Sequence, residues 1–316
     1  MDPGGGGIFR EEKECRKEER FMKINSFCLT CLIQMQESQV REFTDEEKKM
    51  QYMREVLAFL SSCNPDLSAP ALIRPLSRIY QKYWGEQSGL DAVKKEFNDY
   101  LLSLEQDIEA EIRAHRDPLT ASLLYARTGN YIDYASVKDI SREKLLELFE
   151  NQARDGLDDR EYTHFLDDLS QASFLVYLTD NCGEIVLDKI VLKLLKEQYP
   201  HLSIQVIVRG APVVNDADLD TAVYVGLDKI VPVMGNGSSI AGTDPDDISD
   251  EALRAIEEAD LVISKGQGNF ETLHGCGLNV YYLFLCKCDW FVRRFHAERF
   301  QGMFLNERRI DPTDRK

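Results

Sequence analysis

The chain has 316 residues, of which 43% are hydrophobic and 29% are charged, and its formal net charge is −17 at pH 7. This composition is typical of a globular protein with enough residues for one large core or two modest ones. The acidic excess argues against a nucleic-acid-binding protein, because phosphate backbones are bound by clustered Lys and Arg. No apolar run reaches the roughly 18 to 20 residues that a membrane-spanning helix needs, so we expect no membrane partner.

The first 21 residues are predicted to be a disordered extension, because a glycine run followed by charged residues leaves nothing to bury. The extension lacks the apolar stretch of a secretory signal, so we expect a cytoplasmic protein. The eight cysteines are then expected to be reduced thiols rather than a disulfide framework. Cys28 and Cys31 have the C-x-x-C spacing, which alone leaves structural, metal-binding and redox roles open.

Residues 22–172 are predicted to form a helical domain, because apolar residues recur there at helical spacing. The clearest patterns cover residues 44–60, 69–84 and 91–115, and they are most simply explained by core packing. A further helix is expected to begin at Asp117-Pro118. The segment 127–133, RTGNYID, reads as an ordinary helix terminator when it is taken alone.

Residues 173–316 are predicted to form an α/β domain, because short apolar runs there alternate with helical patterns. The fold class is therefore α/β, with an N-terminal helical lobe followed by a doubly wound, mostly parallel sheet that has helices on both faces. The predicted strands are residues 174–178, 204–208, 229–234, 261–264 and 280–286.

Polar or glycine-rich turns follow several of these predicted strands. Asp180 and Asn181 come after the first strand, Asp216 comes after the second, and Lys265 comes directly after the fourth. Because the carboxyl ends of parallel strands meet at one edge of a sheet, we expect these side chains to converge there. Each of them alone is an ordinary cap or turn residue, so the prediction depends on the convergence.

The chemistry of the converging side chains favours a metal and a phosphate. Asp180, Asn181 and Asp216 offer oxygen atoms suited to Mg²⁺ or Mn²⁺. Lys265 can place a positive charge beside a phosphate, and the amides of residues 266–269 add donors. The predicted reaction class is phosphoryl transfer or phosphate hydrolysis, with the two aspartates and the lysine as catalytic groups. A metal-activated water and an aspartate nucleophile are both compatible with this set.

Two well-known nucleotide-binding motifs fit the sequence poorly. A Walker loop places its lysine after the glycines, whereas Lys265 precedes Gly266 and Gly268. A dinucleotide fingerprint needs G-x-G-x-x-G at the first strand-helix junction, where this chain has only Gly183.

Three of these segments, in this order and spacing, resemble a known family, the metal-dependent damage-control phosphatases, also called domain of unknown function family eighty-nine. The segments are TDNCGE at 179–184, the stretch from Arg209-Gly210 to Asp216-Ala217, and KGQGNFE at 265–271. The resemblance covers residue 22 to about residue 306. The C-x-x-C pair and the motif at 127–133 resemble the branch common in bacteria and archaea.

The resemblance implies an active site between a helical lobe and an α/β lobe. It implies that Asp180, Asn181 and Asp216 bind the metal and that Lys265 holds the phosphate of a small phosphorylated metabolite. Activity in the family is often supported by Co²⁺, Ni²⁺, Mn²⁺ or Mg²⁺, and sugar phosphates and related phosphomonoesters are typical substrates. The remaining implied substrate-binding residues are Asn130, Asp133, Arg209, Gly268, Asn269 and Glu271.

Two other functions stay open at this level. Some relatives carry the label of carboxyl methyltransferase, although the chain has no glycine-rich loop after its first predicted strand to bind S-adenosylmethionine. A non-catalytic protein that senses a metabolite or a metal would use the same oxygen ligands. Measurable binding of S-adenosylmethionine would support the methyltransferase, and tight binding of phosphate esters and metal without turnover would support the sensor.

Overall fold

The computed structural model describes residues 22–86, 90–131, 147 and 156–310. The predictions for the N-terminal extension and for Asp133 lie outside these residues. Among the described residues, no helix combines the length and apolarity needed to cross a membrane.

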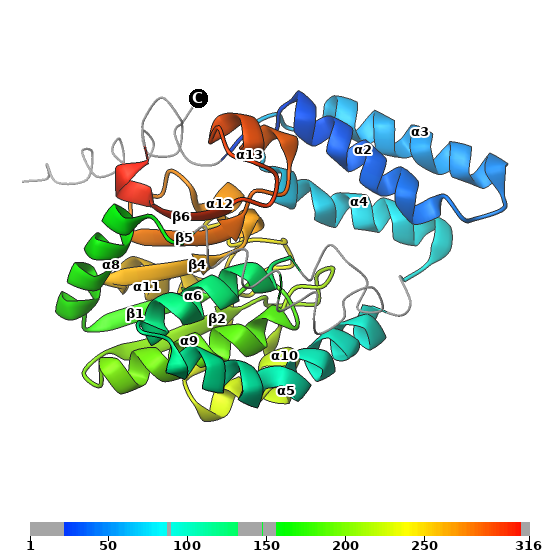
Figure 1. Cartoon of the computed structure of the whole chain (residues 1–316). Helices are drawn as coiled ribbons and strands as arrows, with labels where there is room; N and C mark the ends of the chain where they lie inside the picture. Colours follow the sequence, from blue (N-terminus) through cyan, green and yellow to red (C-terminus); the bar gives the residue numbers. More distant parts are fainter. Residues whose placement is uncertain (1–21, 87–89, 132–146, 148–155, 311–316) are drawn as a thin grey trace, which may run out of the picture.

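The centre of the molecule is a six-stranded sheet (Figure 1). Its strand order is β3-β2-β1-β4-β5-β6, in which the first five strands are parallel and β6 is antiparallel to β5. The order runs outward from β1 and β4 in opposite directions, as expected for a doubly wound sheet. The strands are β1 (Phe174–Leu178), β2 (Ser203–Val208), β3 (Val233–Gly235), β4 (Leu261–Lys265), β5 (Val280–Leu285) and β6 (Gly302–Asn306).

Helices cover both faces of the sheet, because its central strands are buried on both sides. In β1, Leu175 and Tyr177 belong to one core and Val176 and Leu178 to the other, as the two-residue period of a strand requires. The first core is shared with α5 (Leu90–Ala114), α6 (Pro118–Gly129), α8 (Asp159–Gln171), α9 (Glu184–Gln198) and α10 (Leu219–Tyr224). The second is shared with α11 (Asp250–Glu258), α12 (Gln267–Leu273) and α13 (Asp289–Arg294).

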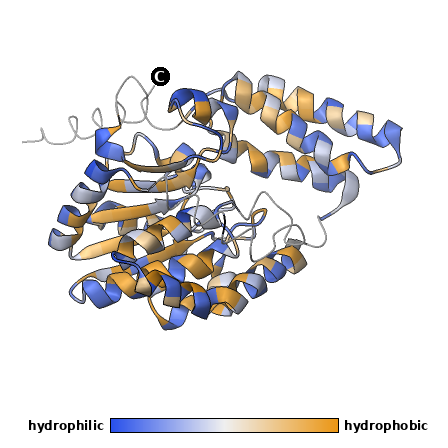
Figure 2. Ribbon diagram, viewed as in Figure 1, coloured by the Kyte–Doolittle hydropathy of each residue, from blue (hydrophilic) through white to orange (hydrophobic). Residues whose placement is uncertain are grey.

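The first three helices have a core of their own. These helices, α2 (Ser26–Val40), α3 (Glu46–Ser62) and α4 (Ala69–Trp84), extend to one side of the sheet (Figure 1). The hydropathy colouring in Figure 2 shows hydrophobic positions along them, and their shared core includes Leu32, Tyr52, Val56 and Leu72. By packing, therefore, only α2–α4 form a separate helical unit, whereas α5, α6 and α8 belong to the core of the sheet. A domain boundary at residue 172 stays a prediction.

The structure differs from the predicted elements near the third and sixth strands. A strand was expected over residues 229–234, but β3 covers only Val233–Gly235, and Leu227–Lys229 is a 3₁₀ helix. Pro232 explains the late start, because it has no N–H to donate to the neighbouring strand. β6 and the short helix α12 were not predicted.

Candidate active site

The turn after β1 is tied to the turn after β2 by backbone hydrogen bonds. The Ala217 amide donates to the Asp180 carbonyl at 2.8 Å, and the Cys182 amide donates to the Asn215 carbonyl at 2.9 Å. Asn181 and Asp216 also form an isolated antiparallel bridge. The convergence expected from parallel strands is therefore found for Asp180, Asn181 and Asp216, all of which are buried.

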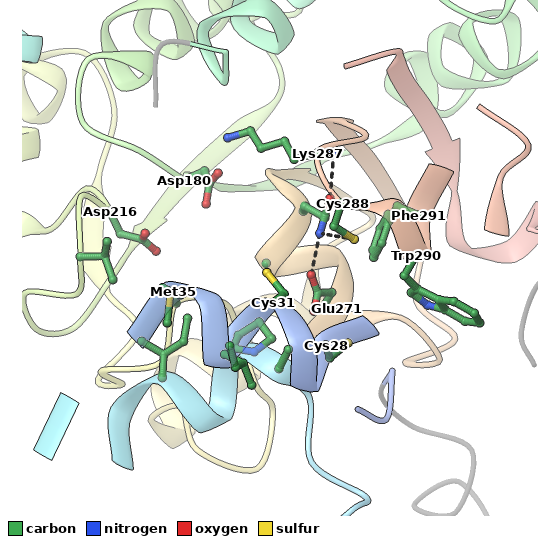
Figure 3. A pocket seen from close by; sticks show the side chains of 18 of the residues that line it. Cys28, Cys31, Met35, Asp180, Asp216, Glu271, Lys287, Cys288, Trp290 and Phe291 are labelled. Atoms are coloured by element: carbon green, nitrogen blue, oxygen red, sulfur yellow. Dashed lines mark hydrogen bonds between the residues drawn. The ribbon is translucent and has the colours of Figure 1, made fainter. Parts of the chain in front are cut away.

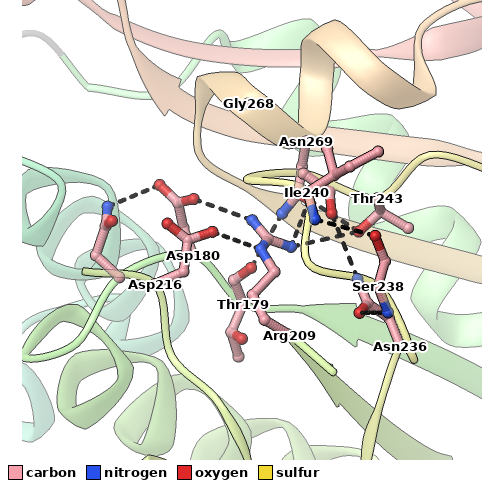
Figure 4. A network of polar contacts seen from close by, with 12 residues as sticks. Thr179, Asp180, Arg209, Asp216, Asn236, Ser238, Ile240, Thr243, Gly268 and Asn269 are labelled. Carbon is pink, nitrogen blue, oxygen red and sulfur yellow. Dashed lines mark hydrogen bonds and ion pairs between the residues drawn. The ribbon is translucent and has the colours of Figure 1, made fainter. Parts of the chain in front are cut away.

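Arg209 connects the two aspartates through one guanidinium group (Figure 4). Its Nε donates to Asp216 Oδ2 at 2.5 Å and its Nη2 to Asp180 Oδ1 at 3.3 Å. Its Nη1 donates to Asn269 Oδ1 at 2.9 Å. Arg209 is only 1% exposed, so the guanidinium fixes the two carboxylates relative to one another rather than facing solvent.

Gly266 allows the Asp180 side chain to lie against the turn after β4. A Cβ atom at this position would stand 2.0 Å from Asp180 Oδ2, and the residue has φ +81, a value that side-chain-bearing residues rarely adopt. The position therefore requires glycine for two independent reasons.

Lys265 lies behind this cluster in a fully buried ion-pair network. Its Nζ donates to Glu184 Oε1 at 2.6 Å, to Asp188 Oδ1 at 2.6 Å and to the Ala126 carbonyl at 3.0 Å. Burial raises the pKa of Asp188 to about 6, although the Lys265 charge opposes this shift. To reach a substrate phosphate, the ammonium would have to leave all three partners. The assignment of Lys265 as the phosphate-holding residue stays a prediction.

Asn130 joins the cluster from the end of α6. Its Nδ2 donates to Asp180 Oδ2 and to Glu184 Oε2, each at 2.8 Å. Its Oδ1 is buried and has no hydrogen-bond partner among the described residues. The Nδ2 of Asn181 likewise donates to Asp180 Oδ2 at 2.8 Å. An unsatisfied amide oxygen beside carboxylates suits a cation or a hydroxyl donor.

The buried cluster has more negative than positive groups. Four buried carboxylates are matched by two buried cations, the guanidinium of Arg209 and the ammonium of Lys265, so the fully ionised cluster carries two excess negative charges. Burial raises the pKa of Asp180 well above its usual value, and the neighbouring charges of Asp216 and Glu184 raise it further. The four carboxylates are Asp180, Glu184, Asp188 and Asp216.

A divalent cation fits this cluster by charge and by donor type. It would neutralise the two excess charges, and the oxygen-rich set suits a hard metal. Within the described part of the chain, no three His, Cys, Asp or Glu side chains are grouped closely enough to hold a metal by themselves. Amide oxygens or water would therefore complete the set beside the carboxylates of Asp180 and Asp216, and Asn181 stays the predicted amide ligand.

A cavity of about 290 Å³ opens onto Asp180, Asn181 and Asp216. Gly268 and Glu271 also line it, whereas Arg209, Lys265 and Asn269 stand behind the lining residues. Glu271 is 9% exposed, and burial raises its pKa to about 7. Val214, at the rim, has φ 42, which is a strained conformation for a β-branched residue.

Lys287 is a lining residue that sequence reasoning missed. It follows β5, and Figure 3 shows its side chain extending toward Asp180. Its charge lowers the pKa of Asp180, although burial and the neighbouring carboxylates outweigh it. The rule that was applied to the earlier strands, a polar residue after the carboxyl end, would have found Lys287 after the fifth. Glu184 was included only as the last residue of the TDNCGE segment, without a role of its own.

Comparisons with known proteins point to one family. The family model described as the damage-control phosphatase ARMT1-like domain matches residues 24–301. A damage-control phosphatase from Archaeoglobus fulgidus is 30% identical over 85% of this chain and 93% of its own length. A damage-control phosphatase from Pyrococcus horikoshii is 26% identical over 88% of this chain and 96% of its own length.

A solved structure supports the same relationship. The crystal structure of a DUF89 family protein from Pyrococcus horikoshii has a TM-score of 0.77 and 25% identity, covering 90% of this chain and 99% of that one. The similarity thus extends through both the helical unit and the sheet. This chain belongs to the damage-control phosphatase family.

Proposed function

We propose that this protein is a metal-dependent phosphomonoester hydrolase that acts on small phosphorylated metabolites. The observation that carries the proposal is the buried cluster with two excess negative charges, placed at the carboxyl ends of parallel strands and open to the cavity. Asp180, Asn181 and Asp216 are the proposed metal ligands. Mn²⁺, Mg²⁺, Co²⁺ and Ni²⁺ are the candidate metals.

A bound divalent cation supplies positive charge for a phosphoryl oxygen and makes water more acidic. Arg209 holds Asp180 and Asp216 in place, so little rearrangement is needed when substrate arrives. Lys265 fixes Glu184, which in turn accepts from Asn130. These residues act by positioning other groups.

Lys287 is proposed to bind the substrate phosphate. Its side chain extends toward Asp180 at the same edge of the cavity, so a phosphoryl group bound there would meet positive charge from the lysine and from the metal (Figure 3). Gly268 belongs to the same lining, and it has to be glycine because a Cβ atom there would stand 2.3 Å from the Ala241 carbonyl oxygen.

The proposal is tested by hydrolysis of para-nitrophenyl phosphate after chelation and reloading with each candidate metal. Asp180→Asn is expected to lower kcat/KM by at least about 100-fold, since mutations that remove one transition-state donor typically cost about 10² to 10³. Asp220→Asn, an exposed residue on α10, is the matched control and should keep full activity.

Unchanged turnover in Asp180→Asn would reject the site assignment. Turnover that survives exhaustive chelation without loss would reject metal dependence. The unfolding transition of both variants should be recorded with the kinetics, so that loss of activity is separated from loss of fold.

A further inference from the structure

The cavity has two chemically different sides. The side formed by the sheet edge carries the carboxylates, amides and Lys287 described above. The other side is apolar and is formed by helices, chiefly by Phe27, Leu32 and Met35 of α2, Ile73 of α4 and Trp290 at the start of α13. We call these five residues the apolar wall. None of their side chains can accept or donate a strong hydrogen bond except the indole N–H of Trp290.

The polar groups next to the wall are already engaged with one another. Gln267 Nε2 donates to Glu271 Oε1 at 2.8 Å, and Gln267 Oε1 accepts from the Lys287 amide at 3.2 Å. Glu271 lies in surroundings so poor in water that its pKa rises to about 7. Three thiols, those of Cys28, Cys31 and Cys288, complete this part of the lining, and a thiol behaves as a small apolar group with a weak donor.

This arrangement restricts the alcohol part of the substrate. A phosphomonoester with its phosphate against Asp180 and Lys287 has to place its remaining atoms against the apolar wall, because both sides belong to one cavity. An apolar group gains free energy when it leaves water for such a surface. The hydroxyls of a sugar would lose their water partners there and find few replacements.

We propose that the preferred substrate is a phosphomonoester of a predominantly apolar alcohol, such as an alkyl, thioether or aryl phosphate, rather than a sugar phosphate. The proposal rests on the phosphatase function proposed above and specifies its substrate class. The cavity volume of about 290 Å³ is at the lower end of the roughly 300–1,000 Å³ of small-molecule sites, so the apolar part is small.

The first test is a homologous series of n-alkyl phosphates from methyl to hexyl, compared with phosphates of polyols that have the same number of carbons. The metal-loaded full chain should show kcat/KM rising about fourfold for each added methylene until the cavity is filled. Hexyl phosphate should exceed the six-carbon polyol phosphate by at least about tenfold. Equal rates across the series, or a preference for the polyol esters, would overturn the proposal.

Binding of n-alkyl phosphonates, measured by calorimetry, provides a readout that does not depend on turnover. The Kd should fall with chain length in parallel with the kinetic series. If no ester is hydrolysed but phosphonate affinity rises with chain length, the phosphatase function fails and the apolar specificity stands. If esters are hydrolysed and neither series depends on chain length, the specificity fails and the phosphatase function stands.

Two isoleucines on α4 make a matched pair of variants. Ile73 and Ile79 are both half-buried against the core of α2–α4, but only Ile73 lines the cavity. Ile73→Ala should lower kcat/KM for hexyl phosphate about tenfold and leave methyl phosphate unchanged, because only the longer ester reaches the wall. Ile79→Ala should leave the ratio of hexyl to methyl activity as it is in the wild type. An equal effect of both variants on this ratio would contradict the role of the wall.

Discussion

Lys265→Met tests whether this lysine holds the buried carboxylates or the substrate. The ammonium is completely buried and contacts Glu184 and Asp188 at 2.6 Å each. Removing one partner of a buried ion pair typically costs about 3–5 kcal/mol, because the remaining charge has neither water nor a counterion. Two carboxylates are affected here, but each can take up a proton, which limits the loss. We therefore expect a decrease of about 3–5 kcal/mol in the free energy of unfolding at pH 8.

The pH dependence of this loss has a definite sign. In the wild type the pKa of Asp188 is raised from 3.8 to about 6, so its charged form is disfavoured in the folded state, and this cost is present above pH 6 and absent below about pH 4. Without Lys265 the cost of ionising Asp188 is larger. The difference between variant and wild type should therefore shrink as the pH falls from 8 to 5, because the Asp188 carboxyl becomes neutral.

Urea unfolding followed by tryptophan fluorescence measures this difference, since Trp84 and Trp290 report on the helical unit and on the second core of the sheet. Lys287→Met is the comparison variant, because Lys287 lines the cavity and is only partly buried. It should lose clearly less stability than Lys265→Met, because its side chain is only partly buried, and it should raise KM for phosphate esters. If Lys265→Met instead keeps its stability and raises KM, the ammonium of Lys265 binds substrate and its structural role is refuted.

Three further predictions concern the turn after β4, Glu271 and the metal. Gly266→Ala should lower kcat by at least about 100-fold, because the added methyl group displaces Asp180. Gly277→Ala is the control: this glycine has φ +73 and open space around it, so the variant should lose stability but not activity. Equal activity of the two variants would contradict the predicted clash. Glu271→Gln should stabilise the protein by about 3 kcal/mol above pH 7 and by almost nothing at pH 4.5, because a folded-state pKa of about 7 makes ionisation of Glu271 costly only at higher pH. Urea titrations at the two pH values measure this difference in stability. A stabilisation that does not depend on pH would refute the prediction. Removal of the metal by chelation should lower stability at pH 8, because the two excess charges of the cluster are then uncompensated, and thermal unfolding with and without Mn²⁺ should show a higher midpoint with metal only while Asp180 is present.

Much of the fold could be predicted from the sequence, because the hydrophobic pattern of most elements matches the face that they bury. β1 and α4 have the predicted bounds, and Asp117 caps α6 as expected by accepting from the Thr120 amide at 3.1 Å. β6 could not be found in this way, because an antiparallel edge strand depends on pairing with β5 rather than on a strong pattern of its own. β3 is the opposite case: the apolar run at residues 229–234 predicted a longer strand than the one observed, because Pro232 interrupts the run.

The position of a candidate site residue was predictable where it depends on the order and direction of the strands. Neighbouring parallel strands put the turns that carry Asp180, Asn181 and Asp216 at one edge of the sheet, and hydrogen bonds between these turns bring the side chains together. The direction of the Lys265 side chain was not predictable from the sequence. Its partners Glu184 and Asp188 are four residues apart and therefore share one face of α9, but the same spacing is equally typical of a solvent-exposed pair. The apolar wall depends on how α2 and α4 pack against the sheet, which no local pattern encodes.

Helices α2–α4 have a hydrophobic core separate from that of the sheet, yet they supply most of the apolar wall. In the proposed function, most residues that would contact the alcohol are therefore stabilised by other contacts than the residues that would bind the phosphate. Substitutions in the first set would then change the substrate preference of this protein while the ionic network of the second set stays intact.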